Sequence, residues 1–201
     1  MPNLDLTHYQ RNLPHRLPPG ETIFLTFRLA GTLPRAVLEQ LRAAWEEQDQ
    51  RHRPDEDHYT RQKRYFGRYD SLLDSAATGP TWLRVPTVAQ LIMEALHHYD
   101  GNSYQLICYC LMPNHVHLVV ALPDEVPPLA RTLQYLKGYT AQKANALLGR
   151  SGQFWHRESY DHIVRSPAEL ARIIGYVLEN PVKAGLVAEW QAWPYTYWAE
   201  L

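Results

Sequence analysis

The sequence predicts an α+β fold, in which helices pack on an antiparallel sheet. Three observations predict it: one segment with strict alternation of apolar residues, two short apolar segments separated by a tight turn, and apolar residues at helical spacing between them. The alternating segment is residues 21–30, where Ile23, Leu25, Phe27 and Leu29 share one face. Such mixing in a chain of 201 residues favours one domain with helices on one face of the sheet.

Two helices are predicted between the first strand and the tight turn. Gly31–Pro34 ends the strand, and Val37, Leu38, Leu41 and Trp45 then follow at helical spacing. Residues 47–62 are polar and charged, which favours a loop or a frayed helix end. Thr87 is a candidate N-cap for the second helix, which we expect to close at Asp100-Gly101.

The next elements are a hairpin, a helix, a strand and a last helix. Residues 104–111 and 115–121 predict antiparallel strands joined through Met112-Pro113-Asn114. A long helix follows, with apolar positions from Leu129 to Leu147, and then a short strand at Tyr160–Arg165. The last helix opens at Ser166-Pro167 and cannot run far past Asn180, because Pro181 disfavours helical geometry there.

Composition is that of a soluble globular protein. The hydrophobic fraction is 45% and the charged fraction 20%, and no apolar run approaches the roughly 20 residues of a membrane helix. The start of the chain does not resemble a secretory signal. Two cysteines, Cys108 and Cys110, favour a reduced cytosolic interior. We expect a single domain over 1–201, with an N-terminal extension at 1–20 and a C-terminal tail at 181–201.

The charge distribution is uneven along the chain. The net charge of −1 argues weakly against a non-specific nucleic-acid coat. Residues 131–172, which include Lys137 and Lys143, carry seven cations and three acids, a local excess of +4. This excess fits nucleic-acid binding and solvated helix faces equally well.

The most specific local pattern is His115-Val116-His117. Residues i and i+2 of a strand project to the same face, so both imidazoles can reach one metal ion. Val116, with Leu118 and Val120, then faces the core. A bare His-x-His pattern is more often a coincidence than a metal site, and a bound metal needs at least a third protein ligand.

The last helix supplies candidates for the missing groups. At about 100° per residue, its apolar residues form one stripe, and Tyr176 lies roughly 130° from the centre of that stripe. Asn180, four residues later, lies on the same flank. A phenol and an amide so placed could approach a metal together. By themselves, Tyr176 is more simply explained as a partly buried surface aromatic and Asn180 as a helix C-cap.

The segment CLMPNHVHLVVALP (110–123) resembles the HUH motif of the single-tyrosine transposases, and specifically of the REP-associated tyrosine transposases. Further blocks are similar to that family in the same order, so the resemblance spans the chain from about residue 15 to Trp198. These blocks are ETIFLTFRLAGTLP (21–34), RYFGRYDSLLD (64–74), LKGYTAQKANALLGRSGQFWHRESYDHIVR (136–165) and YVLENPVKAGLV (176–187).

This resemblance implies a ferredoxin-like (RRM-like) fold of the HUH-endonuclease type. It implies that Tyr176 is the nucleophile and that His115 and His117 bind Mg²⁺ or Mn²⁺. Related transposases complete the metal site with a glutamine, at the position that Asn180 holds in this chain. The amide of Asn180 is shorter, and it stands at a helix end bounded by Pro181. Tyr139, near basic residues on a predicted helix, is the rival nucleophile, but the family's nucleophile precedes the N-P-V block, as Tyr176 does.

The implied activity is nicking and strand transfer of single-stranded or hairpin DNA, at a repetitive palindromic element, through a 5′-phosphotyrosine intermediate. The segment 154–165 could stack bases and hold phosphates, although Phe154 and Trp155 are also candidates for core anchors, and we expect at least one of them to be one. We expect DNA contacts at Lys137, Lys143, Trp155, Arg157, Tyr160 and Arg165. The protein is expected to be a monomer or homodimer in the bacterial cytoplasm, associated with the nucleoid when bound.

Two other functions fit parts of the pattern. The histidines could hold zinc in a small-molecule hydrolase that uses water as the nucleophile. Alternatively, the chain could be a non-catalytic nucleic-acid-binding module on the same scaffold. Only the transposase hypothesis requires Tyr176 for catalysis.

Overall fold

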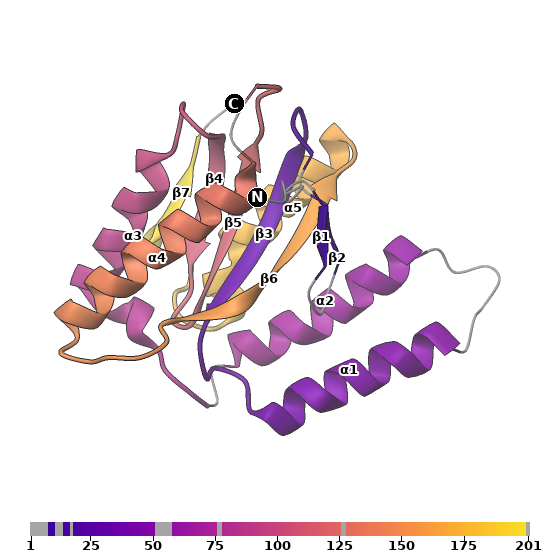
Figure 1. The fold of residues 1–201 in the computed structure, drawn as a ribbon, viewed down its shortest axis with the longest axis horizontal. Coiled ribbons are helices and arrows are strands. Elements are labelled where there is room, and N and C mark those ends of the chain that lie inside the picture. The colour runs from indigo at the N-terminus through magenta and orange to yellow at the C-terminus, as the bar shows by residue number, and fades with distance from the viewer. Residues whose placement is uncertain are drawn as a thin grey trace, which may run out of the picture.

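The centre of the protein is a five-stranded antiparallel sheet, in the order β6-β3-β5-β4-β7 (Figure 1). The structure is a computed structural model that describes residues 8–10, 14–16, 18–50, 58–75, 78–125 and 128–199. Its strands are β3 (Thr22–Leu29), β4 (Gln105–Leu111), β5 (His115–Ala121), β6 (Trp155–Val164) and β7 (Thr196–Trp198). A separate two-stranded ribbon pairs β1 (His8–Gln10) with β2 (Pro14–Arg16).

The described chain contains five α-helices. They are α1 (Arg35–Gln50), α2 (His58–Asp74), α3 (Pro86–His98), α4 (Leu129–Leu147) and α5 (Pro167–Lys183). The order β3-α3-β4-β5-α4-β6 is the βαββαβ pattern of a ferredoxin-like fold, with α1 and α2 inserted between β3 and α3. The predicted α+β, ferredoxin-like fold is therefore confirmed. The helix α2 was not predicted, and it begins inside the segment expected to be a loop.

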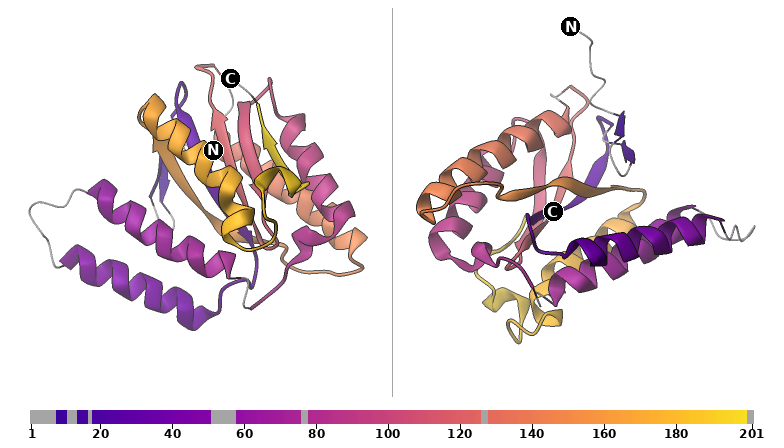
Figure 2. Two further views of the ribbon diagram at one scale, coloured as in Figure 1. Left: turned by 180° about the vertical axis from the view of Figure 1, so that it is seen from behind. Right: turned by 60° about the horizontal axis from the view of Figure 1, so that its bottom comes forward.

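Helices cover both faces of the sheet, not one (Figure 2). Val116, Leu118 and Val120 face a core shared with α3 and α4, as the alternation predicts. On the other face, Val119 packs with residues of α5 and with Phe66 of α2. The prediction of helices on one face holds only for α3 and α4. The opposite side of β5 is also buried, so it needs a second covering layer.

The ends of the last helix agree with their sequence signals. Ser166 is the N-cap, and its hydroxyl accepts a hydrogen bond from the backbone N–H of Glu169 at 3.2 Å. Pro167 follows at the first helical position. The helix continues through Pro181 to Lys183. By contrast, α3 begins after Val85, so Thr87 lies inside the helix and is not its cap.

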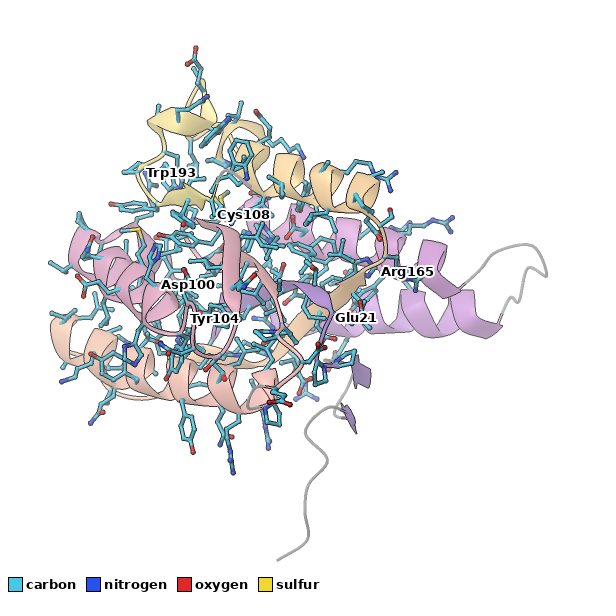
Figure 3. The ribbon with its side chains drawn as sticks, turned by 90° about the horizontal axis from the view of Figure 1, so that it is seen from above. Glu21, Asp100, Tyr104, Cys108, Arg165 and Trp193 are labelled. Atoms are coloured by element: carbon cyan, nitrogen blue, oxygen red, sulfur yellow. The ribbon has the colours of Figure 1, made fainter. Side chains whose placement is uncertain are left out.

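The C-terminal segment adds to the sheet. Within residues 181–201, which we expected to be a tail, β7 pairs with β4. Trp193, labelled in Figure 3, lies in the segment that leads to β7. Its Nε1 donates to the carbonyl of Leu111 at 2.9 Å, which ties this segment to the end of β4. Cys108 and Cys110 of β4 are buried free thiols. Across the described ranges, the helices lack the length and apolar character that crossing a membrane requires.

Candidate active site

Two fully buried histidines form the centre of the site, on the face of β5 that α5 and α2 cover. Their Nε2 atoms lie 3.0 Å apart. The other nitrogen of each ring contacts a neighbouring polar group. Nδ1 of His115 donates to Oδ1 of Asn114 at 2.6 Å, and Nδ1 of His117 lies 2.8 Å from the Thr26 hydroxyl. Contacts of this kind at Nδ1 fix the ring orientation and direct Nε2 toward a shared ligand.

Two carboxylates from α2 reach the same place. Oδ1 of Asp70 lies 3.4 Å from Nε2 of His117, and Oδ1 of Asp74 lies 3.7 Å from Nε2 of His115. The acids are four residues apart on one helix, so they project from the same side of it. All four candidate ligand atoms lie within 4.8 Å of one another. Such a cluster of nitrogen and oxygen atoms could hold a metal ion.

Burial controls the protonation of these groups. It lowers the pKa of His115 to about 3 and that of His117 well below its ordinary value, so both rings are neutral at pH 7. Burial also raises the pKa of Asp70 well above its ordinary value, with the neighbouring Asp74 carboxylate as the second cause. The pKa of Asp74 rises to about 6. One buried and one half-buried carboxylate next to neutral imidazoles form a site that a cation would stabilise.

The hydrogen bonding of the cluster fits a metal ion. Oδ1 of Asp70, Asp74 and Asn180 are buried and have no hydrogen-bond partner in the described chain. Leaving buried acceptors unpaired costs free energy, and a cation would pair all three. Imidazole nitrogens combined with carboxylate and amide oxygens are ligands that divalent metals accept. The residues present therefore fit the metal that the resemblance implies.

Asn180 reaches the histidines despite its short side chain. It is fully buried, and its Nδ2 lies 3.1 Å from Nε2 of His117. Rotating the amide by 180° would bring Oδ1 to this position, because the oxygen and nitrogen of an amide occupy nearly equivalent places. The sequence left this contact in doubt because Pro181 follows, but α5 keeps its course through Pro181.

Tyr176 lies next to the histidine pair. Its ring centroid is 5.6 Å from that of His117, and 6.2 Å from those of both Phe24 and Phe66. The sequence placed Tyr176 well away from the apolar stripe of its helix. The ring is nevertheless half-buried, because Phe66 of α2 covers that flank.

Lys183 completes the surroundings of Tyr176. Its Nζ lies 4.3 Å from the centre of the Tyr176 ring, close enough for a cation–π contact. Its positive charge also lowers the pKa of Asp70, Asp74 and His117, as a secondary cause in each case. The site thus combines a phenol, an ammonium group and the candidate metal ligands.

Tyr139, the rival nucleophile, lies elsewhere. It belongs to α4, whose leucines pack on the opposite face of the sheet from the histidine pair. Its side chain is 51% exposed to solvent. The structure therefore brings only Tyr176, of these two tyrosines, to the histidines.

Two of the expected DNA contacts are core residues. Trp155 is buried against Phe27 and Phe154, and its Nε1 donates to the Thr140 hydroxyl at 2.8 Å. Tyr160 is buried and stacks on Phe66, with ring centroids 4.2 Å apart. Neither ring presents a face to solvent for base stacking, so we correct both assignments. Helices cover both faces of β6, which buries the aromatic residues of a segment that its charges suggest is exposed.

The four expected cationic contacts are spread over the surface. Lys143, Arg157 and Arg165 are exposed, and Arg165 lies where β6 turns into α5 (Figure 3). Lys137 is half-buried, and its Nζ donates to the carbonyl of Arg157 and to the hydroxyl of Ser159. None of the four lies in the cluster of candidate metal ligands.

Sequence reasoning missed Asp70, Asp74 and Lys183. A usable signal was present, since RYFGRYDSLLD places two acids at i and i+4, next to aromatic and apolar residues at helical spacing. That pattern predicts a helix with both acids on one side. It does not reveal that the helix packs beside β5.

Comparison with known proteins finds similarity to transposases. The family described as "Transposase IS200 like" matches residues 86–180, a segment that includes the histidines, Tyr176 and Asn180 but neither acid. A curated protein of Haemophilus influenzae, described as a REP-associated tyrosine transposase, is 30% identical over 112 residues. The match spans 51% of this chain and 62% of that relative.

A solved structure shares the fold. It is described as a REP-associated tyrosine transposase bound to a REP hairpin, and it matches with a TM-score of 0.55 and 15% sequence identity. The match covers 94% of this chain and 80% of that one. The family match and the curated relative confirm the resemblance that the sequence motifs carry, and the solved structure confirms the fold.

Proposed function

Because this chain is related to the IS200-like transposases, and among them to the REP-associated tyrosine transposases, we propose that it cuts and rejoins single-stranded DNA with Tyr176 as the nucleophile. One observation carries the proposal: Tyr176 packs against His117, and Asn180 and the α2 acids lie around the same imidazoles.

The reaction is a transesterification at a phosphodiester. Oη of Tyr176 forms a bond to phosphorus while the bond from phosphorus to the 3′-oxygen breaks. The phenol loses its proton and the departing 3′-oxygen gains one. The 5′-phosphate remains linked to the protein, so the bond energy is conserved and another 3′-hydroxyl can reverse the attack.

The residues of the site have distinct roles in this reaction. Phe24 and Phe66 hold the tyrosine ring beside the histidines. The ammonium of Lys183, 4.3 Å from the centre of the Tyr176 ring, would attract the negative charge that develops on the phenol oxygen and on the phosphate during the reaction. Asn114 and Thr26 keep both imidazoles oriented.

A divalent cation, Mg²⁺ or Mn²⁺ in this proposal, would be held by His115, His117, Asp70 and Asn180, with Asp74 beside them. When bound, it would withdraw charge from a non-bridging oxygen of the scissile phosphate and orient it for attack. Asp70 and Asp74 supply the negative charge that attracts the cation.

The proposed substrate is a single strand that carries a hairpin, such as a repetitive palindromic element. The Haemophilus influenzae relative is named for its association with REP elements, and the protein in the solved structure is bound to a REP hairpin. A compact site built from side chains of β5, α2 and α5 suits a single strand better than a duplex, because the scissile phosphate must reach the tyrosine.

A strand-transfer assay tests the proposal. The protein is incubated with a labelled hairpin oligonucleotide, Mn²⁺ and a second oligonucleotide that ends in a free 3′-hydroxyl. We expect joined products in which the second oligonucleotide has acquired the 5′-phosphate of the first, and we expect chelation to prevent them. Cleavage that gives only hydrolysed ends, or products that form without metal, would contradict the proposal.

A further inference from the structure

The outer side of α4 carries a line of exposed cations and aromatic rings. Arg131, Tyr135, Tyr139 and Lys143 follow one another at intervals of four residues, so neighbouring members lie side by side on the helix. We refer to these four residues as the α4 ridge. All four are exposed, the tyrosines by 59% and 51%.

The charge of α4 is of one sign. The helix contains three cations and no Asp or Glu, in a chain whose net charge is −1. Lys143 lies over the Tyr139 ring, 6.0 Å from its centroid. Solvated helix faces usually mix both signs, because pairs at i and i+4 stabilise the helix. A helix without acids is instead suited to a polyanion.

The α4 helix contains a glycine that no packing contact within the described structure requires. Gly138 is exposed between the two tyrosines of the α4 ridge, and a Cβ there would meet no atom within 4 Å. A glycine inside a helix makes the helix less stable than an alanine at the same position does. Two other helical glycines in the described ranges, Gly67 and Gly175, are open in the same way and adjoin Phe66 and Tyr176 of the proposed active site. A ligand that approaches the backbone closely from outside would account for glycine at such positions.

We infer that the α4 ridge is a second DNA-binding surface, where bases stack on Tyr135 and Tyr139 and phosphates bind Arg131 and Lys143. Exposed aromatic rings interleaved with cations are the combination that binds single strands. The inference rests on the proposed function insofar as DNA is the substrate.

This surface is separate from the site of cleavage. The α4 helix packs on the face of the sheet opposite His115 and His117. Lys137 links it to the edge strand β6, through its bonds to the carbonyl of Arg157 and the hydroxyl of Ser159. DNA held on the ridge can therefore pass around this edge toward Tyr176. The ridge then contributes affinity but no chemistry.

Equilibrium binding of a labelled single-stranded hairpin tests the inference, with Tyr176→Phe as the background to prevent covalent capture. Replacing both ridge tyrosines by serine is expected to raise Kd by about tenfold or more. Replacing both by phenylalanine, which keeps the rings, should leave Kd within about twofold. Salt dependence tests the phosphate contacts. Lys143→Gln should reduce the slope of the logarithm of the association constant, plotted against the logarithm of the salt concentration, by about 0.7. Arg84→Gln removes an exposed cation that lies outside α4 and should leave that slope unchanged.

Gly138→Ala separates the inference from a purely structural role for the helix. The change is expected to raise the melting temperature, because alanine favours the helix, and yet to weaken DNA binding.

With Tyr176 intact and saturating DNA, all ridge variants should form the covalent adduct at the wild-type level. If the ridge variants form the adduct and bind DNA with an unchanged Kd, the inference is overturned while the proposed function stands. Tyrosine-to-serine variants that alter only the oligomeric state would overturn it in favour of contact between copies of the chain. Absence of any adduct in the wild type would instead count against the proposed function.

Discussion

Tyr176→Phe is expected to reduce covalent adduct formation and strand cleavage by at least about 10³-fold, because it removes the nucleophilic oxygen. The ring contacts with Phe24, Phe66 and His117 do not involve that oxygen. The fold should therefore be unchanged, and the Kd for DNA should stay within about twofold of the wild-type value. Cleavage is measured on a labelled hairpin strand, and binding is measured separately by fluorescence anisotropy.

Tyr139→Phe is the matched control, because it removes a phenol from the opposite face of the sheet and keeps the ring. It should leave cleavage unchanged. Full activity in Tyr176→Phe would indicate a water nucleophile, as in the hydrolase hypothesis. Tight binding without cleavage by either the wild type or the variant would favour a non-catalytic binding module.

Asp70→Asn is expected to produce the second large effect, by weakening metal binding and lowering cleavage by about 10²-fold or more. The lost carboxylate lies 3.4 Å from Nε2 of His117. Saturating Mn²⁺ should raise the melting temperature of the wild type by about 5–10 °C, the shift expected when the metal is present at 100 times its Kd. That shift should disappear in the variant.

The metal-free Asp70→Asn variant should be at least as stable as the metal-free wild type. Asp70 is only 2% exposed and adjoins a second carboxylate, so its charge is costly without a cation. A merely structural aspartate would show the opposite response. Asp74→Asn, which alters the more exposed carboxylate, should have a smaller effect on both measurements. An unchanged Mn²⁺ shift in Asp70→Asn would remove that residue from the metal site.

Local patterns in the sequence predict much of the fold. Alternation in 21–30 and the paired segments around Met112-Pro113-Asn114 correspond to β3, β4 and β5. Both are short-range signals, since strand periodicity and turn residues act within a few positions. The neighbouring histidines follow from the same periodicity, because residues i and i+2 of a strand share a face.

The parts that were missed depend on contacts between distant residues. Asp70 and His117 are brought together by α2, which packs beside β5 through bonds such as that from Nδ2 of Asn114 to the carbonyl of Leu73. No local pattern encodes that packing. The same applies to Trp155 and Tyr160, since the sequence shows aromatic residues among charges but not the helices that bury them.

The central claim is that Tyr176 acts at the cluster formed by His115, His117 and the α2 acids. The most direct test isolates the denaturation-resistant protein–DNA adduct formed with Mn²⁺, digests it and identifies the modified peptide by mass spectrometry. The account predicts a nucleotide remnant on Tyr176, linked through a 5′-phosphate, in a yield that falls to background when the metal is chelated. A remnant on Tyr139 or any other residue, or the same yield without metal, would contradict it.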